Sequence, residues 1–353
     1  MSKRTTIKDI AKKVGVSTAA VTYVLNDTPK VGKEVRDLVL KTIAEMGYRQ
    51  NKTAQALSRK PLNIGIVIAE QPAEYYGYIT AGMENELRGL IDYKFSAIFR
   101  TFKDMTSREE VRDILEELYE TDIKGLLFVP GFDYSAFQDT LKKFVKKGIP
   151  ILYVVSHVPG AKGIGCVTMN GKMAGRMAAQ FLGFCLGSKK AVAVLAGNKK
   201  SKLHIESIKG FEEESKKNKL ILKGIYETKI DKKIAYNITK FLLDTIPDLK
   251  GIYVSTYDSV SVCKCIEDYN KKGQIIVIGH DLYPKLVAKL NNGSLKATLF
   301  QDLEEQGRKA VQSMYSYLTE GGKPIGDVLI TPNMVFSSNV EGFNYKLYSR
   351  NSN

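Results

Sequence analysis

The sequence VGVSTAAVTYVLN at residues 14–26 predicts two short helices joined by a tight turn. Gly15 permits the turn, and Ser17 can cap the second helix. The helix before the turn has one apolar face, with residues at i, i+3, i+4 and i+7: Ile7, Ile10, Ala11 and Val14. The second helix has its own apolar stripe, formed by Ala20, Val21, Val24 and Leu25. The two apolar faces are expected to pack together, which leaves the opposite face of the second helix free.

A third helix is expected to complete this small core and to stop at Gly47. Its apolar positions are Val35, Leu38, Val39, Ile43 and Met46. Residues 1–60 contain thirteen Lys or Arg and five Asp or Glu, a net charge of +8, whereas the whole 353-residue chain carries +15. About half of the excess positive charge therefore lies in a sixth of the chain, which favours neutralisation of phosphates. Together the turn and the charge predict a DNA-binding module.

The motifs of this module follow one another in a fixed order: residues 6–11 (TIKDIA), 14–17 (VGVS), 21–26 (VTYVLN) and 47–48 (GY). They continue in Asn51, Ala54, Gln55, Ala56 and Leu57. In this order and density they resemble the LacI/GalR family of bacterial transcription regulators, with residues 51–57 in the place of that family's hinge helix. Three positions depart from the family pattern: Tyr23 stands where many members have Arg, Gly32 replaces a Ser or Thr helix cap, and Gln50 replaces a Pro.

The resemblance implies DNA-contacting roles for eleven residues. Those expected to position the module on phosphates are Thr6, through its backbone, and Ser17, Thr22, Asn26 and Lys30. Those expected to meet base edges in the major groove are Thr18, Ala19 and Tyr23. Those expected in the hinge helix are Asn51, Ala54 and Leu57, of which Leu57 would wedge into the minor groove and bend the DNA. A wedge from each of two protomers implies a homodimer on a palindromic operator.

From Pro61 onward, short β-rich runs alternate with helical stretches. Strands are expected at 64–69, 95–99, 125–129, 151–155, 191–196, 221–226, 251–255 and 275–278. Helices are expected near 77–91, 107–121, 135–147, 171–186, 204–218, 232–245 and 259–271. This alternation predicts parallel sheets with right-handed crossovers, and its two series predict two α/β lobes.

This region resembles the effector domain of the same family. The expected fold is a small all-α helix-turn-helix DNA-binding domain with a hinge helix, followed by a two-lobed α/β domain with parallel sheets (periplasmic-binding-protein-like, type I). The expected parts are residues 1–50 for the DNA-binding domain, 51–60 for the hinge helix and linker, 61–341 for the effector-binding domain and 342–353 for the tail. The first lobe is expected at about 61–157 and 294–322, and the second at about 163–291 and 324–341. The chain would then cross between lobes near 156–162, 291–293 and 323.

Ligands of parallel sheets bind at the carboxyl ends of the strands, here in a cleft between the lobes. Asp281 follows a predicted strand and Gln301 follows the next one, and both match ligand positions of the family. Val155, Ser207 and Tyr257 stand where an acid, an Arg and an Asn are common. Because these departures remove directional polar groups, we expect a ligand that is flatter, smaller or more apolar than an ordinary hexose.

Three further residues are expected near this cleft, after the first strand of the effector domain. Glu70 ends the strand and can accept a hydrogen bond, and Tyr75 and Tyr76 follow it. The two tyrosines either stack on a ligand ring or pack between helix and sheet.

Several classes of protein are not supported by the sequence. It has no Gly-x-Ser-x-Gly, phosphate-loop or His-Glu-x-x-His motif, so we expect neither an enzyme nor a cofactor. Cys263 and Cys265 lack a second ligand pair, so we interpret them as core thiols and expect no metal. The sequence has no apolar run of eighteen residues and no apolar N-terminal signal segment, so we expect a cytoplasmic protein with no membrane contact.

The sequence therefore predicts a sequence-specific DNA-binding transcription regulator, expected to act as a repressor. Its partners would be double-stranded DNA, a small sugar-like or related metabolite between the lobes, and a second copy of the chain. Because the tail lacks an apolar heptad, we expect a dimer rather than a tetramer. Two alternatives stay open: control by a phosphoprotein or a nucleobase co-repressor, and a cytoplasmic solute-binding receptor with a vestigial DNA module.

Overall fold

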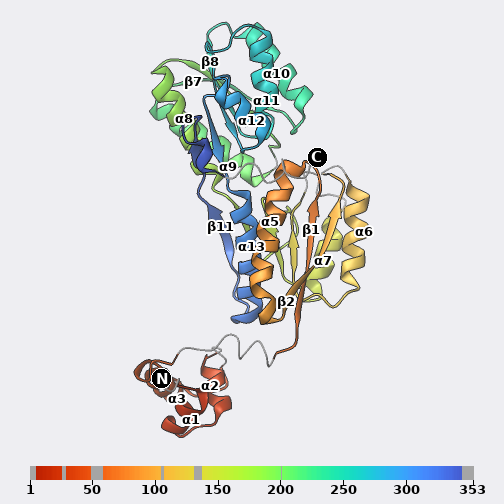
Figure 1. Cartoon of the computed structure of the whole chain (residues 1–353), viewed down its shortest axis with the longest axis vertical. Helices are drawn as coiled ribbons and strands as arrows, with labels where there is room; N and C mark the ends of the chain where they lie inside the picture. Colours follow the sequence, from red (N-terminus) through yellow and green to blue (C-terminus); the bar gives the residue numbers. More distant parts are fainter. Residues whose placement is uncertain are drawn as a thin grey trace.

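The computed structural model describes residues 5–25, 29–48, 59–104, 107–130, 137–199 and 201–343. They form a small helical module and two α/β lobes, which follow one another along the long axis of the molecule (Figure 1). The predicted fold class is confirmed: a short helical N-terminal region precedes a two-lobed domain with parallel sheets.

The helical module consists of α1 (Ile7–Val14), α2 (Thr18–Leu25) and α3 (Lys33–Glu45). Thr6 and Asp9 form a capping box at the start of α1, with each side chain bonded to the backbone of the other residue. Gly15 has a φ of 76°, the left-handed conformation that the turn requires. The buried core is small and drawn from all three helices: Ile10, Ala11, Val21, Val24 and Val39.

The first lobe contains a six-stranded parallel sheet in the order β11-β5-β4-β3-β1-β2. Its strands are β1 (Leu62–Ala69), β2 (Phe95–Phe102), β3 (Leu126–Phe128), β4 (Ile151–Val154), β5 (Gly165–Met169) and β11 (Gly326–Ile330). Its helices are α5 (Ala73–Leu90), η1 (Ile91–Tyr93), α6 (Arg108–Tyr119), α7 (Gln138–Lys146) and α13 (Leu303–Thr319). In Figure 1, α5 and α13 lie together on one side of the sheet, and α6 and α7 lie on the other.

The second lobe repeats this topology in the order β12-β10-β9-β8-β6-β7, except that β12 is antiparallel to β10. Its strands are β6 (Ala191–Ala196), β7 (Ile221–Glu227), β8 (Leu249–Val254), β9 (Ile276–His280), β10 (Ala297–Phe300) and β12 (Asn333–Val335). Its helices are α8 (Gly171–Leu186), α9 (Lys202–Lys217), α10 (Lys232–Thr245), α11 (Ser259–Asp268), α12 (Pro284–Asn291) and η2 (Val340–Gly342). All eight strands expected from the sequence are present.

The chain crosses between the lobes at places other than those expected. β5 and β11 were assigned to the second lobe but pair with each other and with β4 in the first sheet. β10 was assigned to the first lobe but pairs with β9 in the second. The crossings therefore fall after β5, after β10 and after β11, rather than near 156–162, 291–293 and 323. Each of the three expected crossings came one strand too early, because the hydrophobic pattern alone does not show which sheet a short strand joins.

Glycines bring the crossing helices close to their neighbours in both lobes. A Cβ at Gly175 in α8 would lie 1.9 Å from the Ser207 carbonyl oxygen of α9. A Cβ at Gly82 in α5 would lie 1.9 Å from the Glu304 carbonyl oxygen of α13. The backbones of α8 and α9, and of α5 and α13, therefore touch where any larger residue would clash.

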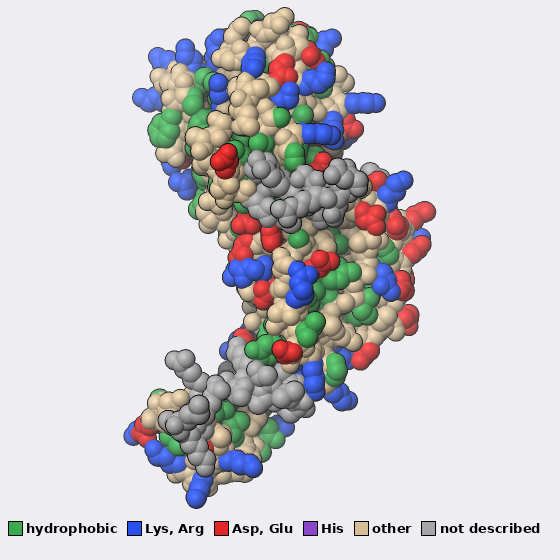
Figure 2. All heavy atoms as spheres, in the orientation of Figure 1, with side chains coloured by type: hydrophobic (Ala, Val, Ile, Leu, Met, Phe, Trp, Pro, Cys, Tyr) green, Lys and Arg blue, Asp and Glu red, His purple; other side chains and the backbone are tan. Residues whose placement is uncertain are grey.

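Charge is unevenly distributed on the face drawn in Figure 2, where Lys and Arg side chains are scattered over the second lobe, mostly toward its outline, and along the margin of the helical module. Asp and Glu gather instead on the flank of the first lobe formed by α6, which carries Glu109, Glu110, Asp113, Glu116 and Glu117. Within the described ranges, no helix has the length and apolarity needed to span a membrane.

Candidate DNA-binding helix and interlobe cavity

The second helix of the module presents its N-terminal end to solvent. Ser17 Oγ accepts a hydrogen bond of 3.1 Å from the Ala20 N–H, so Ser17 caps α2 as expected. Ser17, Thr18 and Ala19 are exposed, while Val21 is buried against the other helices. The free face of α2 is therefore the face on which the sequence places the base-contacting residues.

The side chain of Tyr23 lies on α2 beside Lys30, whose Nζ is 5.3 Å from the centre of the tyrosine ring. This cation–π contact brings an aromatic ring and a positive charge together next to the exposed end of α2. Thr22 donates its hydroxyl to the Thr18 carbonyl at 2.8 Å, and the Thr6 side chain bonds to Asp9. Four predicted DNA-contacting residues lie outside the described residues: Asn26, Asn51, Ala54 and Leu57.

A cavity lies between the two lobes at the carboxyl ends of their central strands. Its volume is about 70 Å³, and it is partly open to solvent. Six of the eight predicted effector residues line it: Tyr75, Tyr76, Val155, Tyr257, Asp281 and Gln301. The first lobe contributes Tyr75, Tyr76 and Val155, and the second contributes the other three. The structure therefore brings together most of the predicted effector site.

Asp281 follows β9 and is buried in the cavity wall. Its Oδ1 accepts a hydrogen bond from the Gln301 amide, and Gln306 donates in turn to the Gln301 backbone oxygen at 2.9 Å. Burial raises the pKa of Asp281 to about 7; the Gln301 hydrogen bond lowers this pKa, and the nearby Asp258 carboxylate raises it. Asp281 therefore changes charge near neutral pH.

Two histidines of the lining are neutral. Burial lowers the pKa of His204 to about 4 and that of His280 to about 3. The Tyr253 hydroxyl lies 2.7 Å from His280 Nε2 and fixes the orientation of that ring. Because both imidazoles are uncharged at neutral pH, they contribute no positive charge to the cavity.

The positions of the two tyrosines after β1 are compatible both with stacking on a ligand ring and with packing between helix and sheet. Their ring centres are 5.1 Å apart with the rings nearly perpendicular, and both line the cavity. Tyr76 is also part of the buried core of the first lobe, against which Tyr75 packs. Across the cavity, Tyr257 stacks on Tyr283 at 4.4 Å, and burial raises the pKa of Tyr257.

Two predicted effector residues do not line the cavity. Glu70 is exposed and accepts a 2.7 Å hydrogen bond from Thr101, because β1 ends with its side chain turned toward β2 rather than toward the cleft. Ser207 is buried at the close contact of α8 with α9 and hydrogen-bonds Tyr253. An Arg there would have to displace α8, and Ser207 is not part of the cavity wall.

Sequence reasoning missed several lining residues that carry no family motif. They are Pro72, Pro130, Ser156, Met169, Ser201, Leu203, His204, Ile230, Ser255 and Thr256. Ser255 is the last residue of the predicted strand at 251–255 and Thr256 follows it, so their position at the carboxyl end of a parallel strand could have indicated them. Ser255 is 5% exposed, and its Oγ has no hydrogen-bond partner among the described residues.

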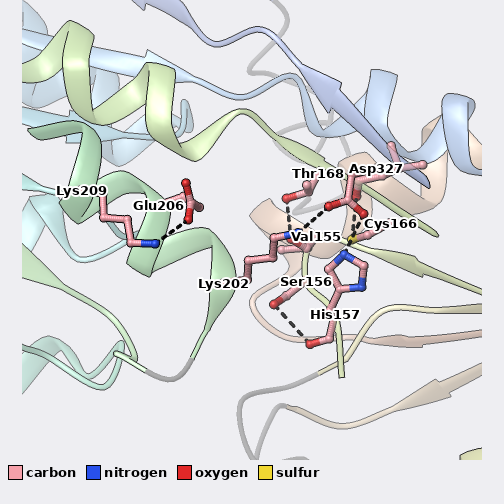
Figure 3. Close-up of polar contacts among 10 residues, drawn as sticks. Val155, Ser156, His157, Cys166, Thr168, Lys202, Glu206, Lys209 and Asp327 are labelled. Atoms are coloured by element: carbon pink, nitrogen blue, oxygen red, sulfur yellow. Dashed lines mark hydrogen bonds and ion pairs between the residues drawn. The ribbon is translucent and has the colours of Figure 1, made fainter. Parts of the chain in front are cut away.

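A cluster of charged side chains joins the lobes beside the cavity (Figure 3). Lys202, on α9 of the second lobe, lies 2.7 Å from Asp327 on β11 of the first lobe. Asp327 also lies 2.7 Å from His157, which follows β4. Lys202 and His157 lower the pKa of Asp327, although its partial burial acts in the opposite direction. One carboxylate therefore ties the two lobes together.

Comparison with protein families finds two matches that account for most of the chain. Residues 6–51 match the model of bacterial regulatory proteins of the lacI family. Residues 64–324 match the periplasmic binding protein domain. The chain belongs to the lacI family. It therefore combines the DNA-binding domain of these transcription regulators with an effector domain of the periplasmic-binding-protein type.

Individual relatives agree with this assignment of the chain to the lacI family. Catabolite control protein A of Priestia megaterium is 26% identical over 208 residues, which are 58% of this chain and 59% of that protein. The transcriptional repressor PurR of Histophilus somni (strain 129Pt) is 23% identical over 348 residues, 95% of this chain and 99% of that one. The arabinose-binding protein AraP of Geobacillus stearothermophilus has a TM-score of 0.70 at 21% identity and covers 81% of this chain and all of its own. This last likeness shows the fold of the two lobes.

Proposed function

We propose that this lacI-family regulator is a cytoplasmic homodimer that represses transcription from a palindromic operator in response to a small metabolite bound between its lobes. The observation that carries the proposal is the position of the cavity, which joins the carboxyl ends of both sheets and is lined from both lobes. A ligand in this position contacts both lobes at once and can shift their relative orientation.

In this proposal α2 enters the major groove. Thr18, Ala19 and Tyr23 contact base edges, and Ser17, Thr22 and Lys30 contact phosphates. The exposed N-terminal end of α2 and its Ser17 cap support this orientation. Tyr23, which holds Lys30 close to its ring, replaces an Arg in the reading position and should give this protein its own operator preference.

The metabolite acts through the segment that follows the module. Asn51, Ala54 and Leu57 are proposed to form a hinge helix in the DNA complex, with Leu57 as the minor-groove wedge. A change in lobe orientation orders or releases this segment, so effector binding and DNA binding are coupled.

The cavity supports binding rather than catalysis. Its histidines are neutral, and the His280 ring is hydrogen-bonded to the Tyr253 hydroxyl. We therefore propose that the protein is not an enzyme and that the ligand leaves the cavity unchanged.

DNase footprinting of genomic fragments with the full chain tests the proposal, alongside sedimentation to determine its mass. We expect a protected site with two-fold symmetry and a particle of twice the monomer mass. Binding of a metabolite without any protected DNA would instead support a solute-binding receptor with a vestigial module.

A further inference from the structure

We propose that the cavity binds an uncharged, flat ring compound that donates hydrogen bonds to Asp281 and accepts one from Ser255, and that it excludes metabolites carrying phosphate or carboxylate groups. The proposal rests on the cavity being the effector site of the regulator described above. It goes further by naming the chemical class of the effector and by adding Ser255 as a residue that contacts it.

The charges around the cavity disfavour an anionic ligand. Its lining contains Asp281 but neither Lys nor Arg among the described residues. His204 and His280 are neutral because burial disfavours their charged forms. The carboxylates of Asp258 and Glu74 lie close enough to raise the pKa of Tyr257. A phosphate or carboxylate in this cavity would lose its hydration shell without meeting a positive charge in the lining, because Lys232 lies behind Tyr257, 5.8 Å from the centre of its ring.

The polar groups of the cavity lie in a row on the second lobe. Ser255, Asp281 and Gln301 follow β8, β9 and β10, which are neighbouring strands of one sheet. Ser255 Oγ is buried and lacks a partner among the described residues, whereas Asp281 already holds the Gln301 amide. Buried hydroxyls are normally hydrogen-bonded, so a ligand atom is the missing partner of Ser255. The ligand therefore presents one polar edge to this row.

The remaining walls are apolar and aromatic. Tyr75 and Tyr76 come from the first lobe, opposite the row of polar groups, and Met169 and Leu203 add apolar surface. Aromatic side chains bind flat rings through their faces and edges. A flat ring compound can place its polar edge toward Asp281 and its faces against the tyrosines, so it fits both the polar and the aromatic wall. A hexose carries hydroxyl groups around its whole rim, so some of them would face the aromatic wall.

Isothermal titration calorimetry of the full-length protein with matched pairs of compounds tests whether the cavity excludes ligands that carry phosphate groups. The pairs are adenine and adenosine 5′-monophosphate, uracil and uridine 5′-monophosphate, and glucose and glucose 6-phosphate. We expect at least one free base to bind, and to bind at least tenfold more tightly than its phosphorylated partner and than glucose. A phosphorylated compound that binds as tightly as its uncharged partner overturns the proposal, as does the absence of binding by both bases.

Two variants test the residues proposed to bind the ligand, and a third variant is a matched control. Ser255→Ala and Asp281→Asn should each weaken binding of the free base about tenfold. Ser215→Ala is the control, because Ser215 Oγ is also buried without a partner among the described residues but lies outside the cavity lining. An equal effect of all three variants overturns the assignment of Ser255. Footprinting without ligand reports on DNA binding alone, so failure of the ligand proposal is distinguishable from failure of the regulator proposal.

Discussion

Val155 and Asp281 occupy equivalent positions in the two lobes and share a backbone conformation that is rare for their residue types. Their φ angles are 71° and 72°, and each directly follows the fourth strand of its lobe, β4 or β9. Each N–H bonds to a carbonyl of the neighbouring strand, at 2.8 Å for Val155 and 3.0 Å for Asp281. Each carbonyl accepts a hydrogen bond from a threonine on that strand, Thr168 or Thr298.

Val155 and Asp281 contribute to the cavity from opposite lobes. A left-handed conformation is costly for a β-branched residue, so these hydrogen bonds must hold the backbone of Val155 in place. In both lobes the result is a side chain directed into the cavity at the end of a strand. One lobe places a carboxylate there and the other an isopropyl group, which makes the two walls of the cavity chemically different.

Asp281→Asn should make the protein more stable at alkaline pH and change how its stability depends on pH. The folded-state pKa of about 7 lies above the usual value of 3.8, so the folded protein binds the proton more tightly than the unfolded chain. The stabilising effect of that proton is complete below pH 4 and is lost as the pH rises through 7. We expect the variant to gain relative to the wild type between pH 5 and pH 8, by as much as a few kcal/mol.

Urea unfolding at several pH values measures this difference. Asp258→Asn is a useful comparison, because burial also raises the pKa of Asp258 but two threonines, Thr228 and Thr256, stabilise its carboxylate. A stability difference between Asp281→Asn and the wild type that is the same at pH 5 and pH 8 would contradict the raised pKa.

The fold followed from the sequence because its strongest signals are local. Helical spacing and caps identified α1, α2 and α3, and apolar runs identified eight strands of the two sheets. The short strands β11 and β12, by contrast, are partly exposed at the edges of their sheets, so they lack a continuous apolar run. The assignment of β5, β10 and β11 to lobes failed for a related reason, because pairing between strands is a property of the assembled sheet.

The sequence predicted the candidate effector site only for residues that lie at the carboxyl end of a strand. Asp281, Gln301 and Val155 lie at such ends and line the cavity. Glu70 also lies at a strand end, but its side chain turns to Thr101, and the sequence contains no signal of that direction. Ser207 was misplaced because the close approach of α8 and α9 depends on Gly175, which lies thirty-two residues away in the chain.

Asp327→Asn should loosen the contact between the lobes and weaken effector binding. Asp327 bonds to both Lys202 and His157, but the Lys202 side chain is 60% exposed, so the ion pair contributes at most about 1 kcal/mol. That energy still changes the ratio of closed to open lobes about fivefold. We expect effector affinity to fall two- to fivefold and the radius of gyration in X-ray scattering to increase.

Glu206→Gln is the matched control for this experiment. It breaks the 3.1 Å pair of Glu206 with Lys209, which lies within α9 and does not join the lobes. If Glu206→Gln and Asp327→Asn change the radius of gyration and the affinity equally, the cluster at Asp327 does not hold the lobes together.

Binding to operator DNA should depend steeply on salt. If each helical module of a dimer neutralises four or five phosphates, log K should fall against log salt with a slope of roughly −7 to −9. Lys30→Gln removes one proposed phosphate contact per module and should reduce the steepness by about 2 for the dimer. Fluorescence anisotropy with labelled DNA between low and physiological salt measures both slopes. A slope near zero for the wild type would exclude phosphate neutralisation by this module.

Val155→Asn should be tolerated although it places an amide where the wild type has an apolar side chain. Asn adopts the left-handed conformation more readily than Val, which relieves a backbone cost of about 1–2 kcal/mol. The loss of apolar burial is limited, because Val155 is only partly buried at the cavity wall. The two effects have opposite signs, so we expect the free energy of unfolding to change by less than about 1 kcal/mol.

The neighbouring residue provides the contrast that makes this prediction specific. Val154 is completely buried within β4, where it has an ordinary strand conformation, so Val154→Asn loses apolar burial and buries an amide without relieving strain. We expect Val154→Asn to cost at least about 2 kcal/mol more than Val155→Asn in urea unfolding. The amide at position 155 also adds a polar group opposite Asp281, so glucose should bind Val155→Asn more tightly than the wild type. Equal destabilisation by the two variants would mean that the backbone at Val155 is not strained.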